Sequence, residues 1–288
     1  LAVHGALAAL GLPDLAAAGT AVLAFAGVLA GLVVKGEPYT YMLYLMADTI
    51  FTYQFAHRKR PDWDERIARF AHHLVEVARS TDADELIVVG HSSGSFLGVE
   101  IMAQALAIDP DLGRRHAHIA FLTVGGNLPI VGFLPVARDF RDQLRRLAVE
   151  PSIDWFDCQS RKDVMNFFPF DPIAGHGLDV GTARRNPRVA IVRLRDLIDP
   201  ARYNLFRWQF FRVHFQFVMA NDRANAYDFF MIVCGPLSLA ARMAHPEPAL
   251  AIATGDAATR AAAWHSLEAP ATQASRAAAS GRAAPPAP

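Results

Sequence analysis

The hydrophobic pattern changes along the chain, and each change predicts a different kind of element. Residues 15–34 form an apolar run without a charged side chain, bracketed by Asp14 and Lys35. As a helix this run would cross about 30 Å, the thickness of the hydrocarbon core of a bilayer. Its many alanines would also suit a buried core helix. Length and the lack of charge favour a membrane span.

Aromatic side chains dominate residues 39–55, and a basic cluster from His57 to Arg60 follows them. Tyrosine belts and basic clusters are typical of the membrane–water interface. The segment is therefore expected to be a second span or a helix lying on the membrane surface. The alternative is a solvated charge cluster after a core helix. With one span, the basic cluster favours a catalytic part on the cytoplasmic side. We predict that residues 1–60 form a membrane-associated segment.

Downstream of this segment, helical and strand patterns alternate. Apolar residues at i, i+3 and i+4 spacing predict an amphipathic helix over 62–79. Branched apolar residues predict buried strands over 86–89 and 119–124, and residues 152–158 alternate as a third strand. Helices are expected between these strands, over 94–108 and 136–149. This rhythm is typical of a parallel sheet in an α/β domain, here residues 61–254. Residues 255–288 are rich in alanine and proline, which predicts a disordered tail.

The first strand runs directly into Gly90-His91-Ser92-Ser93-Gly94, a G-x-S-x-G motif between a strand and a helix. A serine at the tip of a strained turn can project its hydroxyl away from the sheet, and glycines let strand and helix approach closely. The helix begins at the serine, so its N–H groups face the position where an oxyanion would form. Ser93 is the expected first donor. An ordinary βα loop is the alternative to a nucleophilic Ser92.

This segment resembles the nucleophile elbow of the α/β-hydrolase superfamily, especially its lipase and esterase branches. The sequence Leu-Thr-Val-Gly-Gly-Asn over 122–127 is similar to the stretch that follows the nucleophile helix in lipases of the fungal type. Asp163-Val164, with Phe-Phe-Pro at 167–169, is similar to the pattern around their triad acid. The resemblance covers residues 62–235. It implies a mostly parallel sheet flanked by helices, with Asp163 as the acid and Asp157, at the end of the third strand, as its rival.

His214 is the favoured general base. It lies among aromatic residues, where a water-poor pocket and an aspartate on Nδ1–H would keep the imidazole neutral and oriented. The order Ser92, Asp163, His214 matches that of α/β-hydrolases. His176 is the competitor, but it follows Asp163 too closely for an intervening crossover. A core histidine bonded to a backbone carbonyl is the alternative for His214.

Composition narrows the remaining choices. The 28 Lys and Arg residues balance 28 Asp and Glu residues, which gives no case for nucleic acid. No histidine, cysteine or glutamate spacing indicates a metal, and no P-loop or G-x-G-x-x-G indicates a nucleotide, so no cofactor is expected. The two cysteines, Cys158 and Cys234, do not suggest a disulfide scaffold. The chain begins at Leu1 rather than methionine, which is consistent with a fragment or a processed form.

These patterns together predict a membrane-associated serine hydrolase that cleaves carboxylic esters through an acyl-enzyme. Phenylalanines near the expected acid and base favour an acyl chain in the substrate. They lie at 167, 168, 170, 210, 211 and 215. Acyl transfer to another acceptor would use the same residues. A membrane-anchored binding or scaffold protein with a hydrolase fold is the alternative, because the sequence identifies no second oxyanion donor.

Overall fold

The computed structural model describes residues 2–11, 14–115 and 117–267. Its internal contacts divide the chain into two compact units, with the boundary between Gln54 and Phe55. The predicted boundary after residue 60 lies slightly later, at the start of the helix that opens the second unit's α/β pattern. Each unit is described by itself.

The N-terminal unit is helical and contains α1 (Ala2–Ala9), α2 (Asp14–Thr40) and most of α3 (Met42–Ala56). Within α2, residues Ala18–Thr40 form a helix long and apolar enough to cross a membrane. Its large apolar side chains are exposed, Leu23 to 74% and Phe25 to 69%, which does not fit a core helix. No other described helix meets the same criterion of length and composition. At 15 residues α3 would reach only about 22 Å, so a second span over 39–55 is not supported.

The second unit is built on a parallel sheet with strand order β1-β2-β3-β4. The strands are β1 (Glu85–His91), β2 (His118–Val124), β3 (Ile153–Gln159) and β4 (Arg188–Ile191). The three strands predicted from apolar patterning are confirmed. All four strands run the same way, so their carboxyl ends meet at one edge of the sheet. Residues following the four strands therefore lie near one another, as ligand-binding residues of open α/β sheets do.

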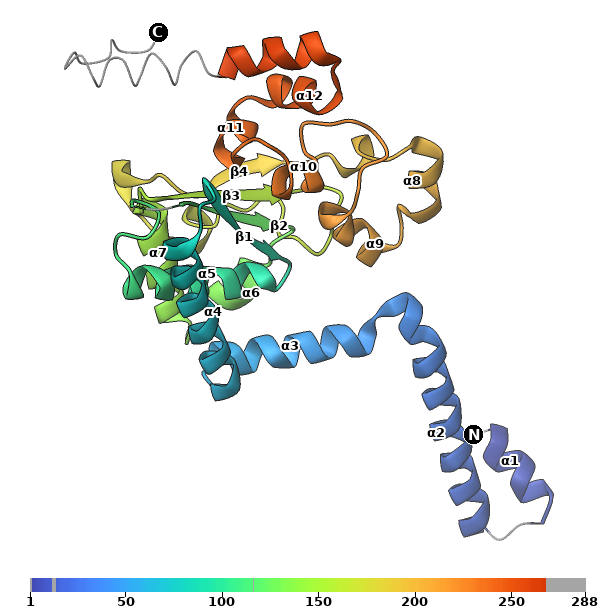
Figure 1. The fold of residues 1–288 in the computed structure, drawn as a ribbon. Coiled ribbons are helices and arrows are strands. Elements are labelled where there is room, and N and C mark those ends of the chain that lie inside the picture. The colour runs from blue at the N-terminus through green and yellow to red at the C-terminus, as the bar shows by residue number, and fades with distance from the viewer. Residues whose placement is uncertain (1, 12–13, 116, 268–288) are drawn as a thin grey trace, which may run out of the picture. The chain divides into compact units, whose positions relative to one another are not determined.

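One face of the sheet is covered by α4 (Pro61–Ser80), α5 (Gly94–Ile108) and α7 (Arg138–Val149), as Figure 1 shows. The helix α5 lies against β2 so closely that a Cβ at Gly98 would come within 2.7 Å of the Phe121 ring. The rings of Phe121 and Trp155 lie 5.2 Å apart on this face. The short helix α6 (Leu128–Gly132) links the end of β2 to α7.

The opposite face is covered by a series of short helices. Because successive strand residues point to opposite faces, Ala120, Leu122 and Val124 of β2 meet this second layer. The layer contributes buried Val213, Phe217 and other apolar residues to one continuous core. Its helices are α8 (Pro200–Phe206), α9 (Phe210–Phe215), α10 (Phe229–Val233) and α11 (Leu239–Ala244), with 3-10 turns at Leu194–Asp196 and Gln216–Val218. The next helix, α12 (Pro246–Thr254), packs in a smaller cluster with Leu237. Two further 3-10 turns lie at Ala174–His176 and Gly181–Ala183. The second unit is thus an α/β fold with helices on both sides of a parallel sheet (Figure 1).

The predicted disordered tail is wrong for its first part. Residues 257–267 are helical, and Ala263 is buried against Leu237, Ala249 and Ile252. Alanine has the highest helix propensity, so an alanine-rich segment forms a helix readily once one face finds apolar neighbours. The rest of the predicted tail, 268–288, lies outside the described residues.

An ion pair with one buried partner, Glu100, holds α5 to the start of this unit. Glu100 of α5 is only 3% exposed, and its carboxylate accepts a hydrogen bond from Arg58, which also contacts Asp64 at 3.2 Å. Burial raises the pKa of Glu100, and the Arg58 charge opposes that rise. At least one residue of the basic cluster that was predicted at a membrane interface, Arg58, therefore has a structural role.

Replacing Arg58 with methionine is expected to lower the free energy of unfolding by about 2–4 kcal/mol. The substitution leaves the Glu100 carboxylate buried without its cation, and such a charge is costly to hold in a core. Urea denaturation of the variant measures the loss. The double variant Arg58→Met/Glu100→Gln is the control and should recover most of it. Equal stability of wild type and Arg58→Met would contradict the assignment.

Candidate active site

The chain turns sharply at Ser92, immediately after β1. Its φ of +55° lies in the left-handed region that residues with a Cβ rarely adopt. The Ser92 N–H donates to the Val124 carbonyl at 3.2 Å, and the Ser92 carbonyl accepts from the Ser95 N–H at 2.9 Å. The first bond continues the β1–β2 pairing and the second opens α5. Ser92 therefore occupies a strained strand-to-helix turn, as predicted from the motif.

The two glycines of the motif have different roles. A Cβ at Gly90 would lie 2.6 Å from the Gly94 carbonyl oxygen and 2.9 Å from the Ser95 Cα, so strand and helix meet over this residue. A Cβ at Gly94 would meet nothing within 4 Å. The predicted close approach is therefore confirmed at Gly90. At Gly94 there is room for a side chain, so the close approach does not require glycine there.

Asp163 and His214 form a buried hydrogen-bonded pair. Nδ1 of His214 lies 2.7 Å from Oδ2 of Asp163, and the two side chains are 1% and 0% exposed. Asp163 belongs to the loop after β3, where its Oδ1 also accepts from the Met165 N–H at 2.9 Å. His214 lies on α9, 51 residues further along the chain. The carboxylate thus leaves the proton on Nδ1 and the acceptor site on Nε2.

The imidazole of His214 lies near the carboxyl ends of β1 and β2, with its ring 4.5 Å from that of His91. A Cβ at Gly125, the residue after β2, would come within 3.1 Å of Cε1 of His214. The preceding residue, Val124, accepts the hydrogen bond from the Ser92 N–H. Nε2 itself is buried and has no hydrogen-bond partner among the described residues. The structure therefore brings Ser92, Asp163 and His214 to the same edge of the sheet, with one ring nitrogen available as an acceptor.

Asp157, the alternative acid, lies elsewhere. It is buried within the sheet, where Oδ1 accepts from the Thr123 hydroxyl at 2.6 Å and Oδ2 accepts from the Gln159 amide at 2.6 Å. Burial raises the pKa of Asp157 to about 6, although both hydrogen bonds favour the carboxylate. Its oxygens are bonded to other groups than a histidine, so the described structure joins His214 to Asp163 and not to Asp157.

His176 is not bonded to a carboxylate in the described structure. Its Nδ1 donates to the Pro172 carbonyl at 2.7 Å, and its ring lies 5.2 Å from Phe133 and 4.9 Å from Phe170. Burial lowers the pKa of His176, which keeps the ring neutral at physiological pH. This histidine is therefore a half-buried residue bonded to a backbone carbonyl.

Two residues at the site were not singled out from the sequence. Asn127 donates from Nδ2 to the Ser93 hydroxyl at 3.2 Å, and its N–H donates to the Ser95 hydroxyl at 3.1 Å. It thereby ties the end of β2 to the first turn of α5, beside the expected oxyanion donor Ser93. His91 lies against the base, with 4.5 Å between the rings of His91 and His214. Their positions in the motifs were visible, but no sequence spacing indicated these contacts.

The pKa of His91 is lowered to about 4, because burial disfavours the charged ring and a charged His214 would repel it. An unfolded histidine titrates near 6.5. Between these values the unfolded chain binds more protons, so stability from a neutral His91 is full above about pH 6.5 and is lost as the pH falls toward 4. His91→Gln should remove this acid sensitivity, which amounts to roughly 3 kcal/mol.

Urea denaturation at about pH 7 and about pH 4 measures the effect as the difference between wild type and His91→Gln. Asp157, with a pKa raised to about 6, changes stability in the opposite direction over part of the same range. That contribution is present in both proteins and cancels in the comparison. An equal loss of stability in wild type and variant would show that His91 does not remain neutral when folded.

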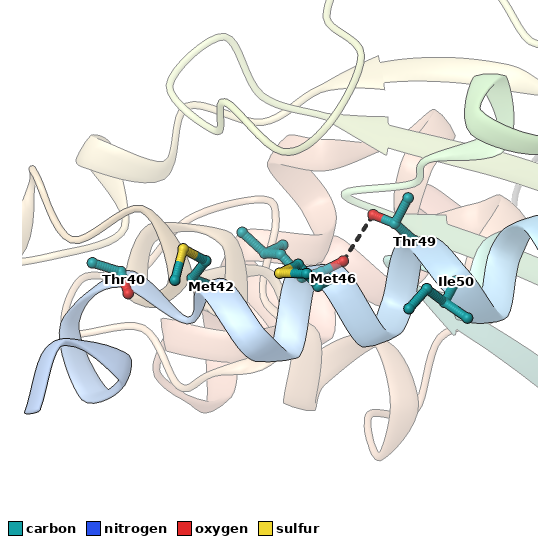
Figure 2. Close-up of a pocket in the computed structure, with 6 residues that line it drawn as sticks. Thr40, Met42, Met46, Thr49 and Ile50 are labelled. Atoms are coloured by element: carbon teal, nitrogen blue, oxygen red, sulfur yellow. Dashed lines mark hydrogen bonds between the residues drawn. The ribbon is translucent and has the colours of Figure 1, made fainter. Parts of the chain in front are cut away.

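The N-terminal unit has a hollow of its own, of about 540 Å³, at the start of α3. Figure 2 shows its lining, which includes Met42, Met46 and Ile50, and Thr49, whose hydroxyl donates to the Leu45 carbonyl at 2.8 Å. No titratable side chain lines this hollow. Nothing in it can act as an acid or a base, so the candidate chemistry belongs to the second unit.

The second unit brings together residue types that serve acid–base and nucleophilic chemistry: a serine, a histidine and an aspartate. Within the described ranges, no cluster of three histidine, cysteine, aspartate or glutamate residues is suited to a metal ion. A comparison with protein-family models, curated proteins and solved structures found no match to this chain. The site itself offers a serine on a strained turn, a buried imidazole whose Nε2 has no hydrogen-bond partner among the described residues, and a carboxylate on the other ring nitrogen.

Proposed function

We propose that this protein is a membrane-associated serine hydrolase that cleaves carboxylic esters. The observation that carries the proposal is the buried Asp163–His214 pair, 2.7 Å from Oδ2 to Nδ1, beside the strained turn at Ser92. A buried pair between residues this far apart in the chain, next to an elbow serine, is the arrangement that activates a hydroxyl.

In the proposed reaction, the Ser92 oxygen attacks the ester carbonyl while Nε2 of His214 takes the hydroxyl proton. The Ser93 N–H donates to the oxyanion at the start of α5. The imidazolium returns its proton to the departing alcohol, leaving an acyl-enzyme. Water, deprotonated by the same nitrogen, then releases the acid. Asp163 holds the ring in the productive tautomer and stabilises its charge. A neutral His91 adds no positive charge to oppose the imidazolium.

An acyl chain is the proposed apolar part of the substrate. Val164, directly after the acid, is 79% exposed, and Phe215, directly after the base, is 39% exposed. The Phe215 ring lies 5.9 Å from that of His214. Phe133 and Phe167 are also exposed, to 58% and 40%. Exposed apolar side chains next to acid and base would gain free energy by covering a hydrocarbon chain.

Membrane attachment is proposed through Ala18–Thr40, the one candidate span among the described helices. A tether of this kind would keep a lipid ester within reach of the site. Fractionation of cells without detergent tests it: the protein should sediment with membranes and be released by detergent, not by high salt. Recovery of the folded protein in the supernatant would remove the tether from the proposal.

Two other functions use the same observations. An acyltransferase would use Ser92, Asp163 and His214 but pass the acyl group to an acceptor other than water. A lipid-binding protein without catalysis is favoured by one feature, the lack of a hydrogen bond to Nε2 of His214 among the described residues. Catalytic hydrogen bonds are often long before substrate binds, so this feature does not oppose the hydrolase.

Labelling by a fluorophosphonate tests the hydrolase directly, because only an activated serine reacts with it at an appreciable rate. The full chain in a neutral detergent should be labelled once per molecule, and short-chain esters should be hydrolysed. If the protein is an acyltransferase that prefers an acceptor other than water, added alcohols should speed product formation. A folded protein that binds lipid but resists labelling would support the binding function instead.

A further inference from the structure

A second cavity opens beside the loop that carries the proposed acid. It has a volume of about 590 Å³ and lies where β3 and β4 end, between the residues that follow those strands and the end of α8. Five cationic side chains line it and no aspartate or glutamate does. The cations are Arg161, Lys162, Arg193, Arg195 and Arg207. We call this cavity the basic groove.

The charges of the basic groove are only partly neutralised. Arg193 and Arg195 have one carboxylate nearby, Asp196, at 4.0 and 3.3 Å. Arg161, Lys162 and Arg207 make no ion pair among the described residues. Cations that face the same cavity repel one another, and an anion bound between them would relieve that repulsion. The groove therefore has the electrostatics of an anion site.

An exposed indole organises two of these cations. Nζ of Lys162 lies 4.5 Å from the ring centre of Trp208, and Cζ of Arg207 lies 5.3 Å from it. Trp208 is 77% exposed, although it is the largest apolar side chain of the region. An exposed tryptophan between cations is suited to a ligand with an apolar body and an anionic group.

The groove and the candidate active site share one edge of the sheet. Lys162 precedes Asp163, so one short loop presents a cation to the groove and the carboxylate to His214. Neighbouring strands are about 4.8 Å apart, which places the ends of β3 and β4 roughly 10–14 Å from the end of β1, where Ser92 lies. Long lysine and arginine side chains can cover part of that distance, and a single ester with an anionic group several bonds from its carbonyl can span the rest.

We propose that the basic groove binds the anionic group, a phosphate or carboxylate, of the ester whose carbonyl Ser92 attacks. The inference rests on the proposed hydrolase for its substrate, but anion binding stands on the groove alone. The anionic group belongs either to the headgroup of a membrane lipid or to a soluble ester. Cations at this place would fix the distance between the headgroup and the scissile bond.

The test uses two soluble esters that differ in the anionic group, dihexanoyl phosphatidate and dihexanoylglycerol, with the full chain in neutral detergent. The wild type should prefer the phosphatidate. Lys162→Met/Arg207→Met should lower that preference at least tenfold, equivalent to about 1.4 kcal/mol, mainly through KM. Arg66→Met is the matched control, because Arg66 also lies 5.3 Å from a tryptophan ring, that of Trp63. It should retain the preference.

Binding to the Ser92→Ala protein separates the inference from the proposed function. Calorimetric titration with dihexanoyl phosphatidate should give saturable binding that weakens at least tenfold in the groove double variant and with added salt. Inorganic phosphate binding as tightly would assign a soluble anion as the source, and much tighter phosphatidate binding would assign a lipid. If the Ser92→Ala protein binds phosphatidate equally tightly with and without the two groove substitutions, the proposed role of the basic groove is overturned. If phosphatidate binding is intact but the wild type is neither labelled nor active, only the proposed hydrolase is overturned.

Discussion

Replacing Ser92 with alanine is expected to abolish fluorophosphonate labelling and to lower kcat for ester hydrolysis by about 10⁴-fold or more. The substitution removes the oxygen proposed to form the acyl-enzyme, while the Asp163–His214 pair stays in place. Alanine is no worse than serine at the φ of +55° that this turn requires, so the loss would be chemical. Thermal unfolding measured beside kcat verifies that the variant remains folded.

Ser152→Ala is the matched control for this prediction. Ser152 lies before β3, at the opposite edge of the sheet, where its hydroxyl donates to Glu150 at 2.8 Å. The control should be labelled at the wild-type rate. Undiminished labelling of Ser92→Ala would mean that the reactive nucleophile is a different residue, and the role of the elbow would then be structural.

The parts of the fold that were predictable have strong local signals. The strands β1 and β2 contain runs of mostly apolar residues, and Gly90 permits the turn that follows β1. The edge strand β4 was missed because it is short and little of it is buried, with Val189 41% and Ile191 66% exposed. A strand that contributes little to the core has no period-two pattern to detect.

The candidate site was predictable only as far as chain order and residue type allow. Asp157 and Asp163 both follow or end the same strand, so sequence left them as rivals. Their difference comes from packing, because α9 brings His214 to the later carboxylate. The basic groove draws its cations from three separate segments and gives no local motif at all. Contacts between distant segments depend on the whole fold, and local patterns in one sequence do not specify them.

Asp163→Asn is expected to lower kcat by about 10⁴-fold, whereas Asp157→Asn should change it less than about tenfold. Asparagine at 163 cannot stabilise the imidazolium, and its amide can turn the ring to the unproductive tautomer. Asp157 bonds Thr123 and Gln159 instead of the base. Its replacement sets two amide donors against each other at Gln159, which should cost about 1–2 kcal/mol of stability.

Thermal unfolding measured beside kcat distinguishes a lost acid from a general loss of structure. In Asp157→Asn the unfolding temperature should fall while kcat changes little. In Asp163→Asn kcat should fall far more than any loss of folded protein explains, because the carboxylate that would orient the ring and stabilise the imidazolium is gone. The reverse result, a large loss in Asp157→Asn and a small one in Asp163→Asn, would identify Asp157 as the acid. The ring of His214 would then have to leave its bond to Asp163 during the reaction, and the buried pair would be a resting state rather than the catalytic one.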